Sequence, residues 1–231
     1  MKVLSYNLEK FKATGELVDL AERFDLDVLC LQECESATLP EELGGLHLAD
    51  STKGNRLDLA VYYRRDRYTS VATQAFSLKK SLHDRIAAPA HERLLASRLR
   101  DLTTGQEFTV ASFHASPLTA LNSLRRAQIA LAHEQLAEFG SGNPELMVGD
   151  YNYPLFRKNL ISTVGKTGHD LTLSDGRTYT RYKFVRGHFD FATSVGMEIH
   201  SVETLPQGKS DHLPILVTAT VSTSTTASAA T

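Results

Sequence analysis

Acidic residues follow the apolar segments of this chain, and their side chains are of the type that binds metal ions. Glu33 comes after the apolar run 28–32, Asp150 comes after 146–148, and Asp211 precedes the last apolar run. Polar residues at the ends of strands can converge at one edge of a sheet even when they are far apart in sequence. Three carboxylates together form an all-oxygen site, which suits Mg²⁺ or Mn²⁺ better than Zn²⁺.

Each of these motifs also has a purely structural explanation when it is taken alone. Glu33 is placed to cap a following helix, and Gly149-Asp150-Tyr151-Asn152 and Ser210-Asp211-His212 are both typical of turns. A lone histidine is more often structural than catalytic. The other polar residues in comparable positions are Asn7, His114, Asn152 and Asp190. The combination in one chain, rather than any single motif, therefore favours a functional site.

The elements that position these residues are predicted to be strands with interspersed helices. Short apolar runs predict strands at 3–6, 27–32, 57–63, 68–76, 94–102, 107–113, 145–148, 188–194, 197–203 and 213–221. Helical spacing predicts helices over 14–24, with Thr14 as N-cap, and over 119–139. We expect 68–76 to form a hairpin with 57–63, and 77–91 to be a long exposed loop. The pattern indicates two packed sheets with helices outside.

Length and composition favour one globular domain. The chain has 231 residues, of which 42% are hydrophobic and 23% are charged. We expect a single domain over 1–221 and a flexible Ser/Thr/Ala-rich tail over 222–231. No apolar run approaches the roughly 18 residues of a membrane span, and the N-terminal apolar run is too short for a signal peptide. A cytoplasmic protein with reduced Cys30 and Cys34 is the expectation.

Charge is distributed unevenly along the chain. Residues 1–52 hold 4 basic and 11 acidic side chains, whereas residues 53–100 hold 11 basic and 4 acidic ones. The basic segment is either a set of solvated strand faces and loops or an electropositive rim that attracts phosphates. Because the isoelectric point is near 6.5, any binding of a polyanion would be local.

The order of the motifs resembles the endonuclease/exonuclease/phosphatase superfamily, the group of deoxyribonuclease I, abasic-site endonucleases, neutral sphingomyelinases and inositol phosphatases. The matching pieces are Ser5-Tyr6-Asn7, Leu31-Gln32-Glu33, Phe113-His114-Ala115-Ser116-Pro117, Gly149-Asp150-Tyr151-Asn152, Phe189-Asp190-Phe191 and Ser210-Asp211-His212-Leu213-Pro214-Ile215. The resemblance implies a four-layer α/β sandwich of two mixed sheets flanked by helices. It also implies metal-dependent hydrolysis of phosphoesters, in a cleft at one end of the sheets.

The resemblance further implies which residues hold Mg²⁺, or Mn²⁺ in its place. Glu33 matches the family's metal-binding glutamate. Asn7 matches an asparagine that helps to hold the metal or the scissile phosphate, and Asp211 matches a further acidic residue near the metal.

Catalytic roles follow from the same resemblance. Asp150 matches the aspartate that aligns or activates the attacking water, and Asn152 matches a donor to a phosphate oxygen. His212 matches a histidine that acts as general base or as a positively charged phosphate clamp, and Asp190 matches the carboxylate that orients it. His114 resembles the second histidine of the deoxyribonuclease I and sphingomyelinase branches.

Four further residues and one pairing complete the expected site. Arg93 resembles a phosphate-gripping arginine, although a solvated arginine at a strand end is an equal alternative. Asp58 is the proposed partner of His114, with a surface position as its alternative. The basic side chains expected at the rim are Lys79, Lys80 and Arg85.

The leading hypothesis is a monomeric Mg²⁺-dependent nuclease, a DNA endonuclease of deoxyribonuclease I-like type, with no membrane association and no obligate protein partner. The alternatives are a phosphatase or phospholipid headgroup phosphodiesterase of the same superfamily, and a non-catalytic binding module on the same fold. The sequence departs from the family pattern in two places: it has no tryptophan, and Gly187-His188-Phe189 precedes Asp190 where the family often has Trp or Arg followed by Ile.

Overall fold

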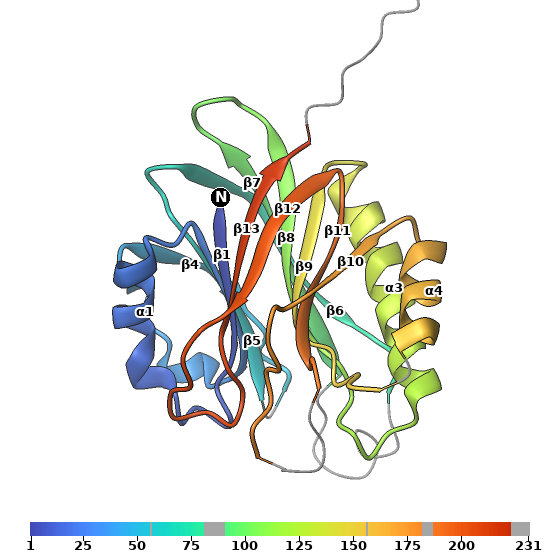
Figure 1. The fold of residues 1–231 in the computed structure, drawn as a ribbon. Coiled ribbons are helices and arrows are strands. Elements are labelled where there is room, and N and C mark those ends of the chain that lie inside the picture. The colour runs from blue at the N-terminus through green and yellow to red at the C-terminus, as the bar shows by residue number, and fades with distance from the viewer. Residues whose placement is uncertain (56, 81–90, 156, 182–186, 223–231) are drawn as a thin grey trace, which may run out of the picture.

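The computed structural model describes residues 1–55, 57–80, 91–155, 157–181 and 187–222. Two β-sheets pack face to face, with helix α1 on the outer side of one sheet and helices α3 and α4 on the outer side of the other (Figure 1). The predicted fold class, a four-layer α/β sandwich of two mixed sheets, is therefore confirmed.

Within the described residues the first sheet has seven strands, and Asn7, Glu33, Asp211 and His212 lie in or next to them. In spatial order the strands are β12 (Met197–Thr204), β13 (Ile215–Val221), β1 (Lys2–Asn7), β2 (Val28–Cys34), β5 (Asp58–Tyr63), β4 (Leu46–Ser51) and β3 (Glu42–Leu43). β1 runs parallel to β2 and antiparallel to β13. The crossover between β1 and β2 contains helix α1 (Leu17–Phe24), as a parallel pair requires.

The second sheet has six strands within the described residues and carries His114, Asp150 and Asp190. In spatial order they are β10 (Asp170–Leu173), β11 (Asp190–Val195), β9 (Glu145–Asp150), β8 (Glu107–His114), β7 (Glu92–Asp101) and β6 (Tyr68–Ser77). β8 and β9 are parallel and are connected through helix α3 (Asn122–Gly140), and α4 (Arg157–Lys166) lies between β9 and β10 in the chain.

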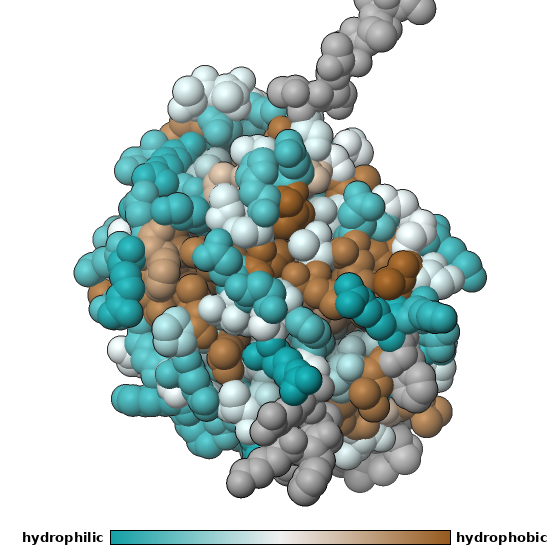
Figure 2. Space-filling model, in the orientation of Figure 1, coloured by the Kyte–Doolittle hydropathy of each residue, from teal (hydrophilic) through white to brown (hydrophobic). Residues whose placement is uncertain are grey.

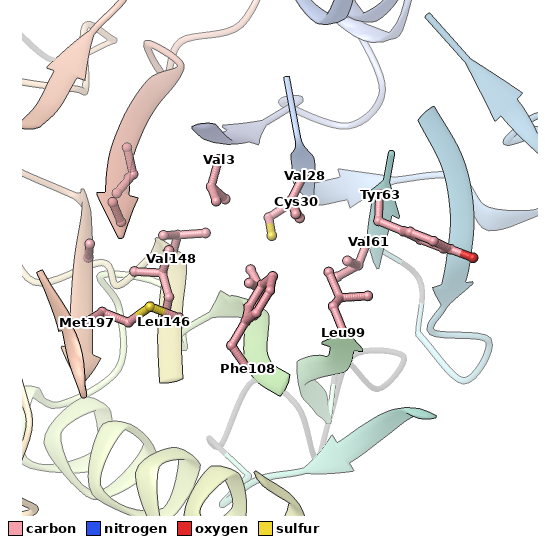
Figure 3. Close-up of a cluster of buried hydrophobic side chains, with 14 of the residues drawn as sticks. Val3, Val28, Cys30, Val61, Tyr63, Leu99, Phe108, Leu146, Val148 and Met197 are labelled. Atoms are coloured by element: carbon pink, nitrogen blue, oxygen red, sulfur yellow. The ribbon is translucent and has the colours of Figure 1, made fainter. Parts of the chain in front are cut away.

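The core between the two sheets is built from the apolar runs of both. Val3, Val28 and Cys30 extend from the first sheet toward Phe108 and Val148 of the second, and all of them are buried (Figure 3). Burial of one large apolar side chain contributes about 1.5–3 kcal/mol, so this layer supplies much of the stability of the sandwich.

Both cysteines are free and buried, which agrees with the expectation that they are reduced. Burial raises the pKa of the thiols of Cys30 and Cys34, so the reactive thiolate is disfavoured at neutral pH.

Two predictions about local structure are wrong. Helix α1 begins at Leu17 after a 3₁₀ turn (Thr14–Glu16), and the Thr14 hydroxyl donates a hydrogen bond to the carbonyl of Phe11 instead of capping the helix. The strand predicted at 68–76 exists as β6, but it pairs with β7 in the second sheet and not with β5. The connection between β5 and β6 crosses between the sheets, and Arg67 within it forms ion pairs with Asp25 and Asp27.

Polar and apolar side chains are mixed over the surface in the view of Figure 2. Large apolar side chains with substantial exposure come from separate parts of the chain: Phe11, Val18, Val71, Leu102, Leu121, Leu155 and Ile161. Within the described residues, no helix combines the length and the apolar character needed to cross a membrane.

Candidate active site

The predicted site residues gather at the end of the sandwich opposite the N-terminus, the lower end in Figure 1. Asn7 ends β1, His114 ends β8 and Asp150 ends β9. The parallel register of β8 and β9 pairs His114 with Asp150, and the antiparallel register of β9 and β11 pairs Asp150 with Asp190. Strand pairing therefore brings together residues that lie far apart in the sequence, such as Asp150 and Asp190.

A β-bulge places Glu33. The pairing of β2 with β5 changes register between Gln32 and Cys34, and Glu33 adopts a left-handed backbone conformation with φ of 56°. A bulge of this kind bends the strand and re-aims one side chain. The backbone amide of Lys10 donates to Glu33 Oε2 over 2.9 Å, which holds the carboxylate in the pocket described below.

Left-handed backbone is concentrated around this site. Three consecutive residues after Leu8, namely Glu9, Lys10 and Phe11, have φ of 46°, 55° and 65°, and Asn152 has φ of 49°. Each non-glycine residue in this region costs about 1–3 kcal/mol when the surroundings must enforce it. In this turn the backbone amide of Glu9 donates a hydrogen bond to Asn7 Oδ1 over 3.1 Å. The strained turn thus helps to orient the side chain of Asn7.

One oxygen atom lies at the centre of the arrangement. Asp150 Oδ2 accepts hydrogen bonds from the side-chain amides of Asn7 (3.1 Å) and Asn152 (2.8 Å). The Nε2 atoms of His114 and His212 lie 3.6 Å and 3.8 Å from the same oxygen. Burial raises the pKa of Asp150, and the neighbouring His212 charge acts in the opposite direction. Four nitrogen groups therefore face one point.

His212 is held by a buried carboxylate. Its Nδ1 lies 2.8 Å from Asp190 Oδ2, and the Thr178 hydroxyl accepts the backbone amide of Asp190 over 3.0 Å. Burial alone would lower the pKa of His212, but the charges of Asp190 and Asp150 outweigh it and raise this pKa. The imidazole therefore holds its proton at neutral pH when no other cation is near.

These groups open into one pocket of about 270 Å³. The sequence-predicted residues that line it are Glu33, His114, Asp150, Asn152, Asp211 and His212. Asn7 and Asp190 lie behind this lining, in contact with Asp150 and His212.

The walls of the pocket also contain residues that the sequence did not predict: Glu9, Lys10, Thr119, Tyr179, Arg181 and Phe189. The Tyr179 ring centroid lies 4.9 Å from that of His212, and Arg181 forms an ion pair with Asp211 over 3.6 Å. Tyr179 and Arg181 lie in a stretch for which the sequence predicts no element, so no signal pointed to them. Glu9 and Lys10 could have been suspected from their distance of two and three residues from Asn7.

The donor set suits a divalent cation. Ligand atoms of Asp150, Asp190 and His212 lie within 4.8 Å of one another, and all three residues are buried. Glu33 and Asp211 add two carboxylates to the same pocket, and burial raises the pKa of both. Several carboxylates that share a partly buried pocket are stabilised by added positive charge, and carboxylate oxygens such as those of Glu33 and Asp211 are preferred ligands of Mg²⁺ and Mn²⁺.

The other predicted residues occupy different positions. Arg93 is buried, which excludes the solvated alternative, and its Nη1 donates to the carbonyl of His114 over 3.0 Å. Asp58, at the start of β5, accepts hydrogen bonds from Ser36 and Thr52, so its pairing with His114 stays a prediction.

The basic residues expected at the rim are only partly placed. Lys79 and Lys80 are exposed, and the Lys79 carbonyl accepts a hydrogen bond from Gln128. Arg85 lies outside the described residues.

Gly149 allows the two strands that carry His114 and Asp150 to approach closely. A Cβ at this position would lie 1.9 Å from the carbonyl oxygen of Phe113, and φ is +149°. We expect Gly149→Ala to lower the free energy of unfolding by about 3 kcal/mol or more, because backbone cannot yield as a flexible side chain does. Urea unfolding followed by circular dichroism measures this.

Gly165, in α4, is the matched control for this substitution. A Cβ there meets nothing within 4 Å, so Gly165→Ala should be neutral or stabilise by up to about 1 kcal/mol. Equal, small effects of the two substitutions would contradict the close approach of β8 and β9.

Comparisons with known proteins agree with this geometry. The model of the endonuclease/exonuclease/phosphatase family matches residues 4–212. The chain is 28% identical to Protein angel of Drosophila melanogaster over 162 residues, 63% of this chain and 44% of that protein, so it spans less than half the length of this relative.

Solved structures share the fold over nearly their whole lengths. Mannosyl-6-phosphatase Bt3783 of Bacteroides thetaiotaomicron is 19% identical with a TM-score of 0.76, covering 95% of this chain and 99% of that one. ANGEL2, a 2′,3′-cyclic phosphatase in complex with adenosine-2′,3′-vanadate, is 14% identical with a TM-score of 0.75 and 94% of each chain covered.

A third similar structure is D. rerio TDP2 complexed with single-strand DNA product. It is 14% identical with a TM-score of 0.72, covering 95% of this chain and 98% of that one. Since the family model spans nearly the whole described chain, this protein belongs to the endonuclease/exonuclease/phosphatase family, whose members are phosphoester hydrolases.

Proposed function

We propose that this protein is a divalent-metal-dependent phosphodiesterase that acts as a monomer and hydrolyses nucleic acid, with DNA as the leading substrate. The observation that carries the proposal is the convergence on Asp150 Oδ2 of two side-chain amides and two imidazoles. Groups that donate hydrogen bonds and positive charge toward one point are the kind that stabilise the charge of a phosphoryl transition state.

Asn152 lines the pocket, and its side-chain amide, like that of Asn7 behind it, donates to Asp150 Oδ2. The second N–H of the Asn152 amide is the donor to an oxygen of a phosphate bound beside Asp150. Neutral donors of this kind orient the phosphate without adding a charge that must be compensated later. A phosphate held there lies between the two imidazoles, whose Nε2 atoms face the same carboxylate from His114 and His212.

The two histidines handle protons on opposite sides of the phosphate. Neutral His212 accepts a proton from water at Nε2, while Asp190 stabilises the imidazolium that forms. His114 donates a proton to the departing alkoxide. Glu33, Asn7 and Asp211 would hold a divalent cation, Mg²⁺ or Mn²⁺, which when bound supplies positive charge beside the phosphate and lowers the pKa of His212.

Two observations support nucleic acid as the substrate class. The similar structures ANGEL2 and TDP2 hold an adenosine analogue and single-strand DNA. The exposed Lys79 and Lys80 lie in the basic segment 53–100, and the Lys79 carbonyl is tied to Gln128, which also binds Ser116 two residues after His114. This link supports the expectation that the two lysines lie near the site.

The second candidate is hydrolysis of a small phosphoester, such as a sugar phosphate or a lipid headgroup. It is favoured by the modest pocket of about 270 Å³ and by similarity to a mannosyl-6-phosphatase over nearly both whole chains. A panel of supercoiled plasmid, single-stranded DNA, abasic duplex, RNA, sphingomyelin, mannose 6-phosphate and inositol phosphates, each with Mg²⁺ or EDTA, separates the candidates. Metal-dependent release of inorganic phosphate without nicking of plasmid would overturn the nuclease proposal.

Neutralising the basic rim tests how DNA is bound. In Lys79→Gln/Lys80→Gln/Arg85→Gln we expect a higher KM for DNA and a log–log salt slope that is shallower by about 0.7–0.9 for each lost phosphate contact. Hydrolysis of a small diester should stay unchanged because it fills only the central phosphate site. Salt titrations of KM for both substrates give the answer.

The control for this variant is Lys2→Gln/Lys166→Gln, which removes two exposed charges from the start of β1 and the end of α4. If the rim variant and this control reduce the salt dependence of KM for DNA equally, the lysines do not bind the DNA backbone. That result would favour small phosphoesters as substrates.

A further inference from the structure

A polar side chain on helix α3 is fixed against the segment that follows His114. Gln128 is fully buried, although glutamine usually lies at the surface. Its Oε1 accepts the backbone amide of Ser116 over 2.9 Å, and its Nε2 donates to the Ser116 hydroxyl over 2.7 Å and to the Lys79 carbonyl over 2.6 Å. The amide is thereby bonded on both sides to two segments of the site.

Arg125, one turn earlier on α3, reaches the same segment. It is 3% exposed, and its Nη1 donates to the carbonyl of Pro117 over 2.7 Å. A second nitrogen, Nη2, donates to Asn122 Oδ1. Within the part of the chain that the structure describes, no carboxylate forms an ion pair with Arg125. Burying a charge without such a partner costs free energy. What Arg125 provides in return is the fixed geometry of its hydrogen bonds to Pro117 and Asn122.

The segment held by these two residues directly follows the end of β8, where His114 lies. Upstream of His114, β8 is fixed by its pairing with β7 and β9. His114 itself is anchored through its carbonyl to Arg93, and the next amide, that of Ala115, donates to the Asp150 carbonyl over 2.8 Å. After Ala115, the hydrogen bonds that hold the chain are those from Gln128 to Ser116 and from Arg125 to Pro117.

We propose that Gln128 and Arg125 are positioning residues that fix the His114 imidazole beside the phosphate and so determine how well it protonates the leaving alkoxide. This inference rests on the proposed function, in which His114 acts as that proton donor. A displacement of about 1 Å at a reacting group can cost about 10²-fold in rate. Loss of the buried bonds should therefore appear in kcat for substrates that need a proton on the leaving group.

The test compares two diesters that differ in the leaving group, the dinucleotide TpT and thymidine 5′-(4-nitrophenyl phosphate). In Gln128→Met we expect kcat for TpT to fall by about 10- to 100-fold and kcat for the nitrophenyl ester by less than about threefold, because nitrophenolate leaves without a proton. The ratio is measured in one preparation, so it does not depend on the fraction that is folded. Arg125→Lys keeps the charge and should move the ratio in the same direction by a smaller factor.

Gln135→Met is the control. Gln135 lies two turns further along α3 and is partly exposed, and its side chain makes no hydrogen bond with the described residues, so the ratio should stay at the wild-type value. The side-chain ¹⁵N shifts of His114, read by NMR, should change in Gln128→Met and not in Gln135→Met.

Equal loss on both diesters with unchanged His114 shifts would overturn the inference and leave the proposed function intact. A wild-type protein that hydrolyses neither diester and does not nick plasmid with Mg²⁺ would overturn the proposed function. In that case His114 shifts that respond to Gln128→Met still support the positioning role, and shifts that do not respond refute it.

Discussion

Replacing His212 with alanine is expected to lower kcat by about 10²–10⁴-fold with little effect on folding. The reason is that His212 Nε2 faces the point where Asp150 and the two amides converge, while Nδ1 is held 2.8 Å from Asp190. Single-turnover hydrolysis of a DNA substrate at saturating Mg²⁺ measures the chemical step separately from binding.

The pH profile identifies what His212 does. As a base it must be neutral, so activity should fall as the pH falls through its pKa. The charges of Asp190 and Asp150 raise this pKa, and a bound cation lowers it again, so the acid limb should move to higher pH as Mg²⁺ is made limiting. Loss of activity on the alkaline side alone would instead identify protonated His212 as a phosphate clamp.

His200 supplies the control for the histidine experiment. It lies on β12, is exposed and contacts Thr220, so His200→Ala should leave kcat and its pH profile unchanged. A His212→Ala enzyme with kcat within about threefold of wild type would remove His212 from the chemistry, since a positioned base contributes more than that.

Removal of the Glu33 carboxylate is expected to weaken Mg²⁺ binding and activity together. At limiting Mg²⁺ we expect a loss of about 10²–10³-fold in rate, because metal stabilisation of the transition state is worth several kcal/mol. Glu33→Ala is the simplest variant. Glu33→Gln is the more specific variant, because glutamine keeps the length of the side chain and removes only the negative charge. This matters at residue 33, whose φ of 56° makes the local backbone sensitive to substitution. Calorimetric titration with Mg²⁺ and activity against Mg²⁺ concentration give the two readouts.

Glu41→Gln is the matched control, since Glu41 is exposed and lies outside the residues that line the pocket. Its Mg²⁺ affinity should equal that of the wild type. Full activity of Glu33→Gln at low Mg²⁺, with unchanged metal affinity, would show that Glu33 is not a ligand.

Sequence patterns predicted the strands well because alternation and apolar runs report directly on burial in a sandwich. The hairpin of β7 and β8 and the long helix α3 were found in this way. The partner of β6 was not predicted. Which sheet β6 joins depends on whether the connection at 64–67 crosses from one sheet to the other, and the residue types in that connection do not encode this. The short strands β3, β4 and β10 and helix α4 were also missed.

Site residues at the ends of strands were predicted from their residue types. Features of the site that depend on an unusual backbone conformation were not predicted. Asp150 and His114 follow apolar runs, and their register as neighbours follows from the parallel pairing. The bulge at Glu33 and the left-handed turn at Glu9 involve residues with no preference for positive φ, so only tertiary contacts can impose them. Tyr179 was missed because the stretch around it has no periodic pattern.

The position of β1 between β2 and β13 has a consequence for the order in which the protein assembles. Among the strands that the structure describes, β1 comes first in the sequence and its partner β13 comes last, with Lys2 opposite Thr218. During synthesis this edge of β1 therefore stays unpaired until residues 215–221 have left the ribosome, and such edges are prone to pairing with other chains. Closure of a loop this long is slow, since contacts between distant residues dominate the fold. Because Asp211 and His212 directly precede β13, the same late step completes the pocket, and a nascent chain lacks the carboxylate and the imidazole of these two residues there until then.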